Sequence, residues 1–192
     1  MFKKALACTM LLSAVCSLPA AADTPLQFKG GIGVHPVSSV TGCPAAPAPC
    51  VTDPDDTISP PPTPPTVNLN IVRGVSPAGQ IWVINDLVAT VHSDGHITVN
   101  GKGLVLAGGN NAGRPPAGAA VIATLICATA APFTQFSTSS AGVLLSPTGD
   151  FQINDTLSSP PPAGCNASPM LLIRNAANLG WFAVGIYNPK GN

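Results

Sequence analysis

The sequence predicts an all-β protein, an antiparallel β-sandwich of about eight or nine strands with an Ig-like or jelly-roll-like architecture. Short apolar stretches alternate with turn residues at regular intervals from Val67 onward, which is typical of such folds. Glu is absent and charged residues make up only 8% of the chain, so Thr, Ser, Asn, Gly and Pro must fill the solvent-facing positions. Those residue types suit strands and turns better than helices.

The N-terminus has the pattern of an export signal over residues 1–22. A basic start with Lys3 and Lys4 precedes an apolar run over residues 5–18, and small residues stand before Asp23. The apolar run is shorter than the roughly 20 residues that span a membrane. We therefore expect a mature protein that begins near Asp23, is secreted or periplasmic, and has no membrane span after cleavage. Lipidation at Cys16 is an alternative, although Val15 is larger than the residue expected beside a lipidated cysteine.

Three regions follow the signal. Residues 23–40 contain a first strand, residues 41–66 form a Pro-rich linker or insert, and residues 67–192 form the main body. Proline lacks the amide hydrogen that a strand ladder needs, so the run of prolines near residue 60 is expected to be extended or irregular. Residues 117–129 would also suit a buried helix, but their Val, Ile and Thr content favours a strand. The body strands are expected at residues 68–75, 80–92, 96–106, 118–128, 134–145, 151–157, 169–176 and 180–187.

Two hairpins are predicted with their register. A three-residue loop at residues 93–95, with Gly95 in the left-handed position, places His92 opposite His96 and Val91 opposite Ile97. This register puts the apolar residues on one face and the polar ones on the other, which a two-residue loop would not do. A loop at residues 147–149 follows the same rule and places Ser146 opposite Asp150.

Four cysteines remain after the signal, and an even number in an oxidising compartment predicts two disulfides. Three pairings are possible. The short segment between Cys43 and Cys50 favours their local pairing, which leaves Cys127 to pair with Cys165.

The charge balance argues against nucleic acid as a partner. Without residues 1–22, six Lys and Arg residues stand against eight Asp, a net charge of −2. No basic field remains for nucleic acid, so the expected partner is an unidentified extracellular ligand or protein.

Candidate metal ligands are few. His92 and His96 face each other across the predicted hairpin, but a zinc site needs three or four protein ligands, and the nearby Asp94 is suited to bonding its own turn. The acidic run at Asp53, Asp55 and Asp56 resembles only the first part of a calcium loop. We therefore predict no metal site and no cofactor, with both groups as solvated polar surface.

No catalytic motif supports an enzyme. The chain has no Gly-x-Ser-x-Gly elbow and no Glu for a mixed carboxylate pair. A Ser–His–Asp triad is not decided by residue order, because triads assemble from distant positions. The prediction is a secreted non-enzymatic protein with a binding or structural role in the envelope or outside the cell, and a secreted hydrolase on the same scaffold is the rival.

A carbohydrate-binding module is a further alternative, based on the last strand. Alternation places Trp181 and Tyr187 at the two ends of one face, with small residues between them. If that face is outward, it offers a platform for a sugar. Trp82 is expected in the core instead.

A family resemblance rests on strand segments at residues 27–34, 70–75, 80–82, 171–174 and 181–183. These segments are similar to those of small exported bacterial proteins whose function is uncharacterised. The resemblance covers most of the body from Leu26 and omits the Pro-rich region. It implies export and a bacterial origin, and it implies no activity or site.

Overall fold

The computed structural model describes residues 24–34, 37–38, 67–68 and 70–189, and this part of the chain is built almost entirely from β-strands. The predicted signal, Cys43, Cys50 and the acidic run at residues 53–56 lie outside the described residues. The elements are β1 (Leu26–Gly33), β2 (Val37–Ser38), β3 (Val67–Asn68), β4 (Trp82–Val83), β5 (Asp86–Val91), β6 (His96–Lys102), β7 (Val105–Leu106), β8 (Ala120–Ile126), β9 (Gln135–Ser137), β10 (Val143–Leu144), β11 (Phe151–Thr156), the short 3₁₀ helix η2 (Cys165–Ala167), β12 (Met170–Asn175) and β13 (Trp181–Tyr187).

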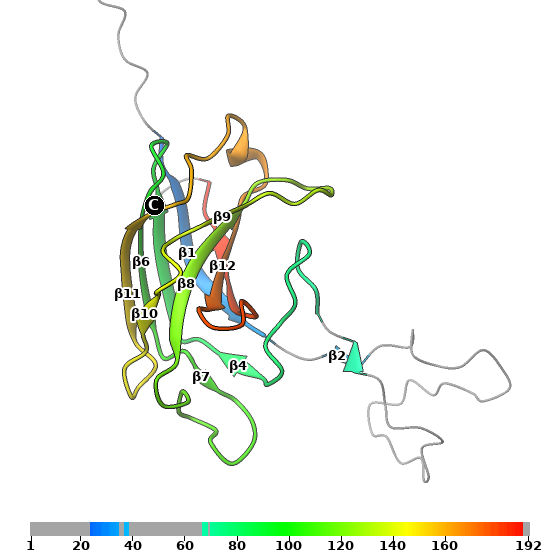
Figure 1. Cartoon of the computed structure of the whole chain (residues 1–192), viewed down its shortest axis with the longest axis vertical. Helices are drawn as coiled ribbons and strands as arrows, with labels where there is room; N and C mark the ends of the chain where they lie inside the picture. Colours follow the sequence, from blue (N-terminus) through cyan, green and yellow to red (C-terminus); the bar gives the residue numbers. More distant parts are fainter. Residues whose placement is uncertain (1–23, 35–36, 39–66, 69, 190–192) are drawn as a thin grey trace, which may run out of the picture.

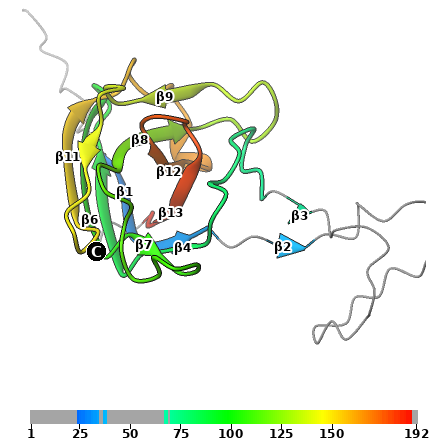
Figure 2. The ribbon, with the colours of Figure 1, turned by 60° about the horizontal axis from the view of Figure 1, so that its bottom comes forward.

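One antiparallel sheet dominates the fold. Its strand order is β10-β8-β12-β13-β1-β5-β6-β11, and β9 pairs with β8 beside β10. Figures 1 and 2 show that this sheet curls strongly, so that β11 and β10 approach each other. Two small ladders, β2 with β3 and β4 with β7, lie outside it. The expectation of an all-β antiparallel fold is confirmed.

Hydrogen bonds between the two ends of the strand order hold the curl. The Ser158 amide donates to the Ser137 carbonyl at 2.8 Å, and the Ser139 amide donates to Asp155 Oδ2 at 2.8 Å. The chain also passes directly from β10 to β11 through a turn in which the Ser146 amide donates to the Asp150 carbonyl. The predicted contact of Ser146 with Asp150 is therefore present. The expected hairpin pairing of Leu145 with Phe151 and of Val143 with Ile153 is wrong, because β10 pairs with β8 and β11 pairs with β6.

The β5–β6 hairpin has the predicted register. Val91 pairs with Ile97 and Ala89 with Val99, and Gly95 has a φ of 91° at the end of the three-residue loop. These four apolar side chains are all buried, which matches the face on which alternation placed them. Local turn chemistry and alternation thus determined the pairing together.

Residues 70–80 differ from the expected strand. They form an irregular segment with a tight turn in which Val72 and Val75 exchange two backbone hydrogen bonds around Arg73 and Gly74. Both turn residues have positive φ, 45° and 76°, which is the backbone of a type I′ turn. Gly103 (φ 64°) likewise separates β6 from β7, so the strands expected at 68–75 and 96–106 were too long.

The segment over residues 70–78 runs alongside β13. The Trp181 amide donates to the Ser76 carbonyl and the Ala78 amide donates to the Trp181 carbonyl, both at 3.0 Å. The Trp181 indole also donates to the Asn70 carbonyl.

Consecutive residues of β8 and β12 are buried, so both faces of these strands are shielded from solvent.

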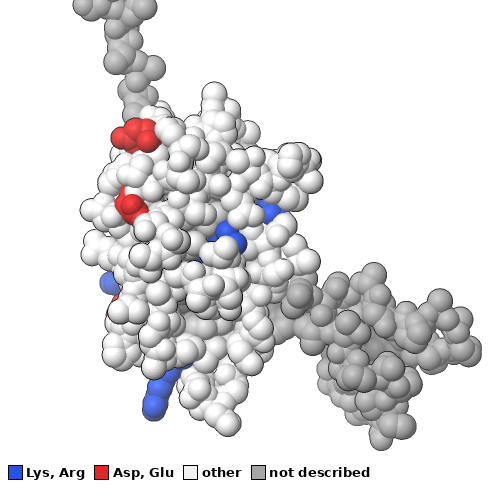
Figure 3. Space-filling view, viewed as in Figure 1, with Lys and Arg blue, Asp and Glu red and all other residues white. Residues whose placement is uncertain are grey.

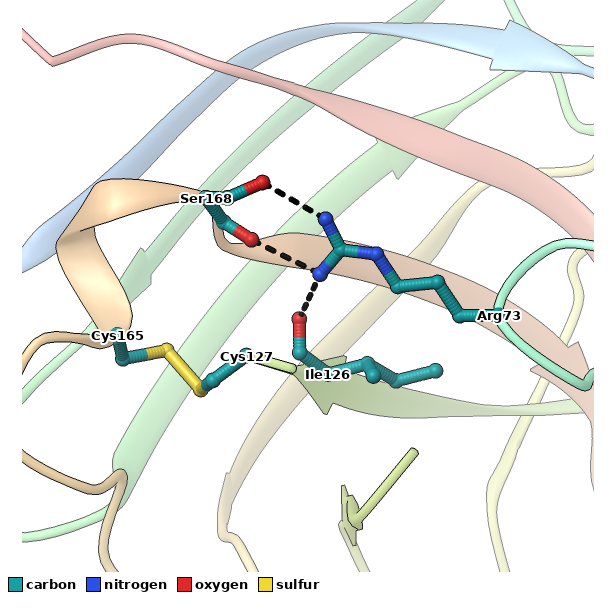
Figure 4. Close-up of a disulfide and its surroundings, with 5 residues drawn as sticks. All are labelled: Arg73, Ile126, Cys127, Cys165 and Ser168. Carbon is teal, nitrogen blue, oxygen red and sulfur yellow. Dashed lines mark hydrogen bonds between the residues drawn. A yellow bond between two sulfur atoms is a disulfide. The ribbon is translucent and has the colours of Figure 1, made fainter. Parts of the chain in front are cut away.

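Arg73 fastens this segment to the sheet. Its Nη1 donates to the carbonyls of Ile126 and Ser168 at 2.7 and 2.8 Å, and its Nη2 donates to Ser168 Oγ at 2.8 Å. Figure 4 shows these bonds beside the disulfide between Cys127 and Cys165, which joins the end of β8 to η2. The predicted pairing of Cys127 with Cys165 is confirmed.

None of the described residues forms a helix that is long and apolar enough to cross a membrane.

Candidate binding groove

A groove of about 570 Å³ lies beside β4. Figure 1 shows this short strand near the lower end of the sheet. Trp82 and Phe182 contribute to its lining, and their ring centroids are 4.0 Å apart with an interplanar angle of 31°. Each side chain is only 3% exposed, so the aromatic pair closes the bottom of the groove and presents little open ring surface. Two backbone bonds position the pair, because the Val34 amide donates to the Phe182 carbonyl and the Trp82 amide donates to the Val34 carbonyl.

Three turns form the rim of the groove. The turn at residues 116–119 closes with a bond from the Ala119 amide to the Pro116 carbonyl, and Gly118 has the positive φ (72°) that a type II turn requires. The turn at residues 139–142 closes with a bond from the Gly142 amide to the Ser139 carbonyl. The third turn begins at Asn175, whose side-chain oxygen accepts a bond from the Ala177 amide at 2.7 Å.

The lining is uncharged throughout. Most of its side chains are Ala, Gly or Pro, and none is Asp, Glu, His, Lys, Arg or Cys. Its side chains with hydrogen-bonding groups are Gln80, Trp82, Ser140 and Asn175, and Trp82 is almost fully buried. Charged side chains are also sparse on the face drawn in Figure 3. The groove therefore offers apolar contact and a few neutral hydrogen-bonding groups.

The two candidate metal ligands lie at the far end of β5 from β4. The rings of His92 and His96 are stacked with centroids 6.0 Å apart. Asp94 Oδ1 accepts a bond from the His96 amide at 2.8 Å, which is the local role expected for a turn aspartate. Within the described ranges, no group of three or more His, Cys, Asp or Glu side chains could hold a metal ion.

The two aromatic residues of the last strand do not share an exposed face. Trp181 is 2% exposed and its indole bonds to Asn70, so the segment over residues 70–78 covers it. Tyr187 is partly buried and packs against Phe28, with ring centroids 5.7 Å apart. A register shift between Ile173 and Arg174 interrupts the pairing of β12 with β13 next to Trp181, so simple alternation does not hold there. Trp82 is buried, as expected.

The groove was not predicted from the sequence. Its rim comes from three turns that are far apart along the chain and consist of small residues, which are ordinary in any loop. The usable signal was Trp82, because a tryptophan in a short strand needs partners on several sides. Finding those partners requires the strand order, which the sequence alone does not provide.

The described residues define the chain as an all-β protein with a curled antiparallel sheet and an uncharged groove at one end. No family model, curated protein or solved structure matches this chain.

Proposed function

We propose that the chain is an exported, non-enzymatic binding protein of the envelope or extracellular space, and that the groove holds a small uncharged ligand. The observation that carries the proposal is the lining, which combines a closed aromatic bottom with neutral rim side chains. Its volume is within the range of ordinary ligand pockets, which are concave and mostly apolar with a few polar groups that orient the ligand.

The same lining argues against the hydrolase alternative. General acid–base catalysis needs a titratable side chain within hydrogen-bond reach of the substrate, and the lining has none. Ser140 is a possible nucleophile by residue type, but no histidine accompanies it in the lining to act as its base. His92 and His96 flank the turn between β5 and β6, and neither lines the groove.

The ligand class follows from the groups present. Ala and Gly surfaces accept apolar faces, and the side chains of Gln80, Ser140 and Asn175 can bond to hydroxyl or amide groups. A neutral saccharide or a neutral amphiphile has both kinds of surface. This groove also replaces the exposed face of the last strand as the location for the carbohydrate-binding alternative.

Export rests on the pattern of residues 1–22 and is supported by the disulfide between Cys127 and Cys165, since disulfides persist in oxidising compartments. A sandwich-like arrangement is supported by the core, in which buried side chains of β8 and β12 belong to the same cluster as those of β5 and β6. Both the signal and the sandwich stay predictions.

The test is thermal unfolding of the oxidised protein with neutral probes: cellobiose, maltose, chitobiose and octyl glucoside. A probe at a hundred times its dissociation constant adds about 2.7 kcal/mol and raises the midpoint by several degrees. Ala177→Phe places a ring in the groove and should abolish the shift. Ala163→Phe changes an equally exposed alanine outside the groove and should preserve it.

Two results would contradict the proposal. A shift that Ala177→Phe leaves intact would place the ligand elsewhere, and no shift with any probe would exclude these neutral ligands. Incubating the same glycans with the protein and measuring released sugar tests the hydrolase, for which we expect no product.

A further inference from the structure

A second cavity, of about 260 Å³, lies between the segment over residues 74–79 and the turn over residues 178–180. It shares Ala78 and Gly79 with the groove, but its chemistry differs because Arg174 contributes to its lining. Arg174 lies on β12 and is 6% exposed, so its guanidinium is one of the most buried charges in the described part of the chain.

The guanidinium of Arg174 has only neutral acceptors. Its Nε donates to the Leu179 carbonyl and its Nη1 donates to Gln135 Oε1, both at 2.7 Å. A longer bond of 3.4 Å joins Nη1 to Thr124 Oγ1. Burial lowers the pKa of Arg174 from its usual value, although an arginine remains charged at neutral pH. A buried charge is ordinarily paired with an opposite charge, and this one has no such partner among the described residues.

The described carboxylates are engaged elsewhere. Asp94 bonds to its own turn, Asp150 accepts bonds from the Gly103 amide and Thr148 Oγ1, and Asp155 accepts bonds from the Ser139 and Thr156 amides. Asp86 is exposed at the start of β5. None of them neutralises Arg174.

One nitrogen of the guanidinium remains available. Nε and Nη1 supply the three bonds described, and Nη2 donates to no described residue. Every fully enclosed side-chain nitrogen or oxygen in the described ranges has a hydrogen-bond partner, so Nη2 must have access to solvent. Arg174 contributes to the lining of the cavity, and Ser76 and Asn178 add further polar side chains to its wall.

Arg73 provides the contrast within the same molecule. Both of its terminal nitrogens are bonded to Ile126 and Ser168, and it is not part of the lining of this cavity. Arg73 therefore uses both terminal nitrogens on the protein itself, whereas Nη2 of Arg174 has no acceptor among the described residues.

We propose that the cavity binds a carboxylate group, which accepts hydrogen bonds from Nη2 of Arg174 and compensates its buried charge. A planar carboxylate matches the donor geometry of a guanidinium, and a charge-assisted bond to it is roughly twice as strong as a neutral one. The cavity is large enough for a small carboxylate or for the carboxylated end of a larger molecule. The site does not depend on the adjoining groove being occupied.

The test is a titration of the protein with sodium acetate and sodium galacturonate at constant ionic strength, followed by amide NMR. We expect saturable shifts at Leu179 and Gly180 and at the Arg174 Nε–H. If galacturonate binds with higher affinity than acetate, the natural ligand is a carboxylated sugar. If the two affinities are equal, the natural ligand is a small free carboxylate. Glucose and sodium chloride, as probes without a carboxylate, should not give these shifts.

Two pairs of variants separate binding from folding. Arg174→Gln should lose at least tenfold in acetate affinity, and Arg114→Gln, an exposed loop arginine, should lose none. Arg174→Gln also removes the hydrogen bond to the Leu179 carbonyl, so Ser76→Glu supplies a second route: its carboxylate occupies the cavity while Arg174 is kept. Ser76→Gln is the neutral control and should still bind acetate.

Three outcomes would overturn the proposal. These are the absence of saturable shifts in the wild type, equal shifts with chloride at the same concentration, and unchanged acetate binding in a folded Ser76→Glu variant. Ala177→Phe, which fills the groove, should leave acetate binding intact, so failure of the groove proposal and failure of this one are distinguishable.

Discussion

Arg73 adopts a left-handed backbone (φ 45°) that costs an ordinary residue about 1–2 kcal/mol, in a turn where glycine or asparagine would be favoured. The side chain offers the compensation, because its three hydrogen bonds connect the turn to the end of β8 and to Ser168 near η2. Arg73 is thus unfavourable for the backbone of its turn, and its side-chain hydrogen bonds to residues distant in the sequence offset that cost.

Arg73→Gly therefore tests which effect is larger. Glycine relieves the backbone, but hydrogen bonds to a charged group contribute about 1.5–3 kcal/mol each and are not fully additive. We expect the variant to lower the free energy of unfolding by about 1–3 kcal/mol, measured by urea denaturation. Arg114→Ala, in an exposed loop, should change it little. If Arg73→Gly raises the free energy of unfolding instead, the backbone strain of the turn outweighs the hydrogen bonds of the Arg73 side chain.

Gly101 is a second residue with a specific packing role. It pairs directly with Phe151 across β6 and β11, and a Cβ at this position would overlap the aromatic ring. Gly101→Ala should lower the free energy of unfolding by about 1–3 kcal/mol, because overpacking forces the ring to move. Gly79→Ala is the matched control, since nothing lies within 4 Å of its Cβ position. Equal urea midpoints for the two variants would contradict this account.

The disulfide acts at the scale of elements, since it connects the end of β8 to η2 over a sequence separation of 38. In the loop-entropy model a bridge of this span contributes about 4 kcal/mol by restricting the unfolded chain. The double variant Cys127→Ala/Cys165→Ala should lose a stability of that order in urea. Reducing this bridge with dithiothreitol should lower the urea midpoint of the wild type, and the double variant has no such bridge to lose. A double variant that is as stable as the oxidised wild type would contradict the expected contribution.

Elements that depend on neighbours in sequence were predictable, and elements that depend on distant contacts were not. The β5–β6 register followed from Gly95 and from alternation, both of which are local. The irregular course of residues 70–80 depends on Arg73 bonding to Ser168 and on Trp181 bonding to Ser76, which no local pattern reveals. Apolar composition alone therefore predicted a strand there.

The candidate sites divide in the same way. Counting cysteines left three pairings, and the short segment between Cys43 and Cys50 favoured the one that joins Cys127 to Cys165. Trp181 was a candidate only if its face is outward, and that condition fails because the segment over residues 70–78 covers it, a contact that alternation does not reveal. The cavity at Arg174 gave no sequence signal, since a lone arginine in an apolar strand has the same composition whether or not a partner lies nearby.

At the scale of the whole molecule, the sheet is protected unequally. The central strands β8 and β12 are buried along almost their whole length, because the curled sheet covers one face and other segments cover the second. The strands β5, β6 and β11 alternate buried and exposed residues, so they are covered on one face only. Stability against local opening should follow this asymmetry.

Native-state hydrogen exchange tests that asymmetry. Buried strands open only when the whole domain unfolds, whereas exposed turns open locally at little cost. We expect the β8 and β12 amides to exchange with the free energy of global unfolding, and the amide of Asp94 at the exposed β5–β6 turn to exchange much faster. The Cys127→Ala/Cys165→Ala variant should lower protection in β8 and β12 by the same amount as its loss of global stability. If protection fell only at the bridge and the remaining β8 amides kept their wild-type exchange rates, β8 and β12 would not belong to one cooperative unit, and the curled sheet would unfold in parts.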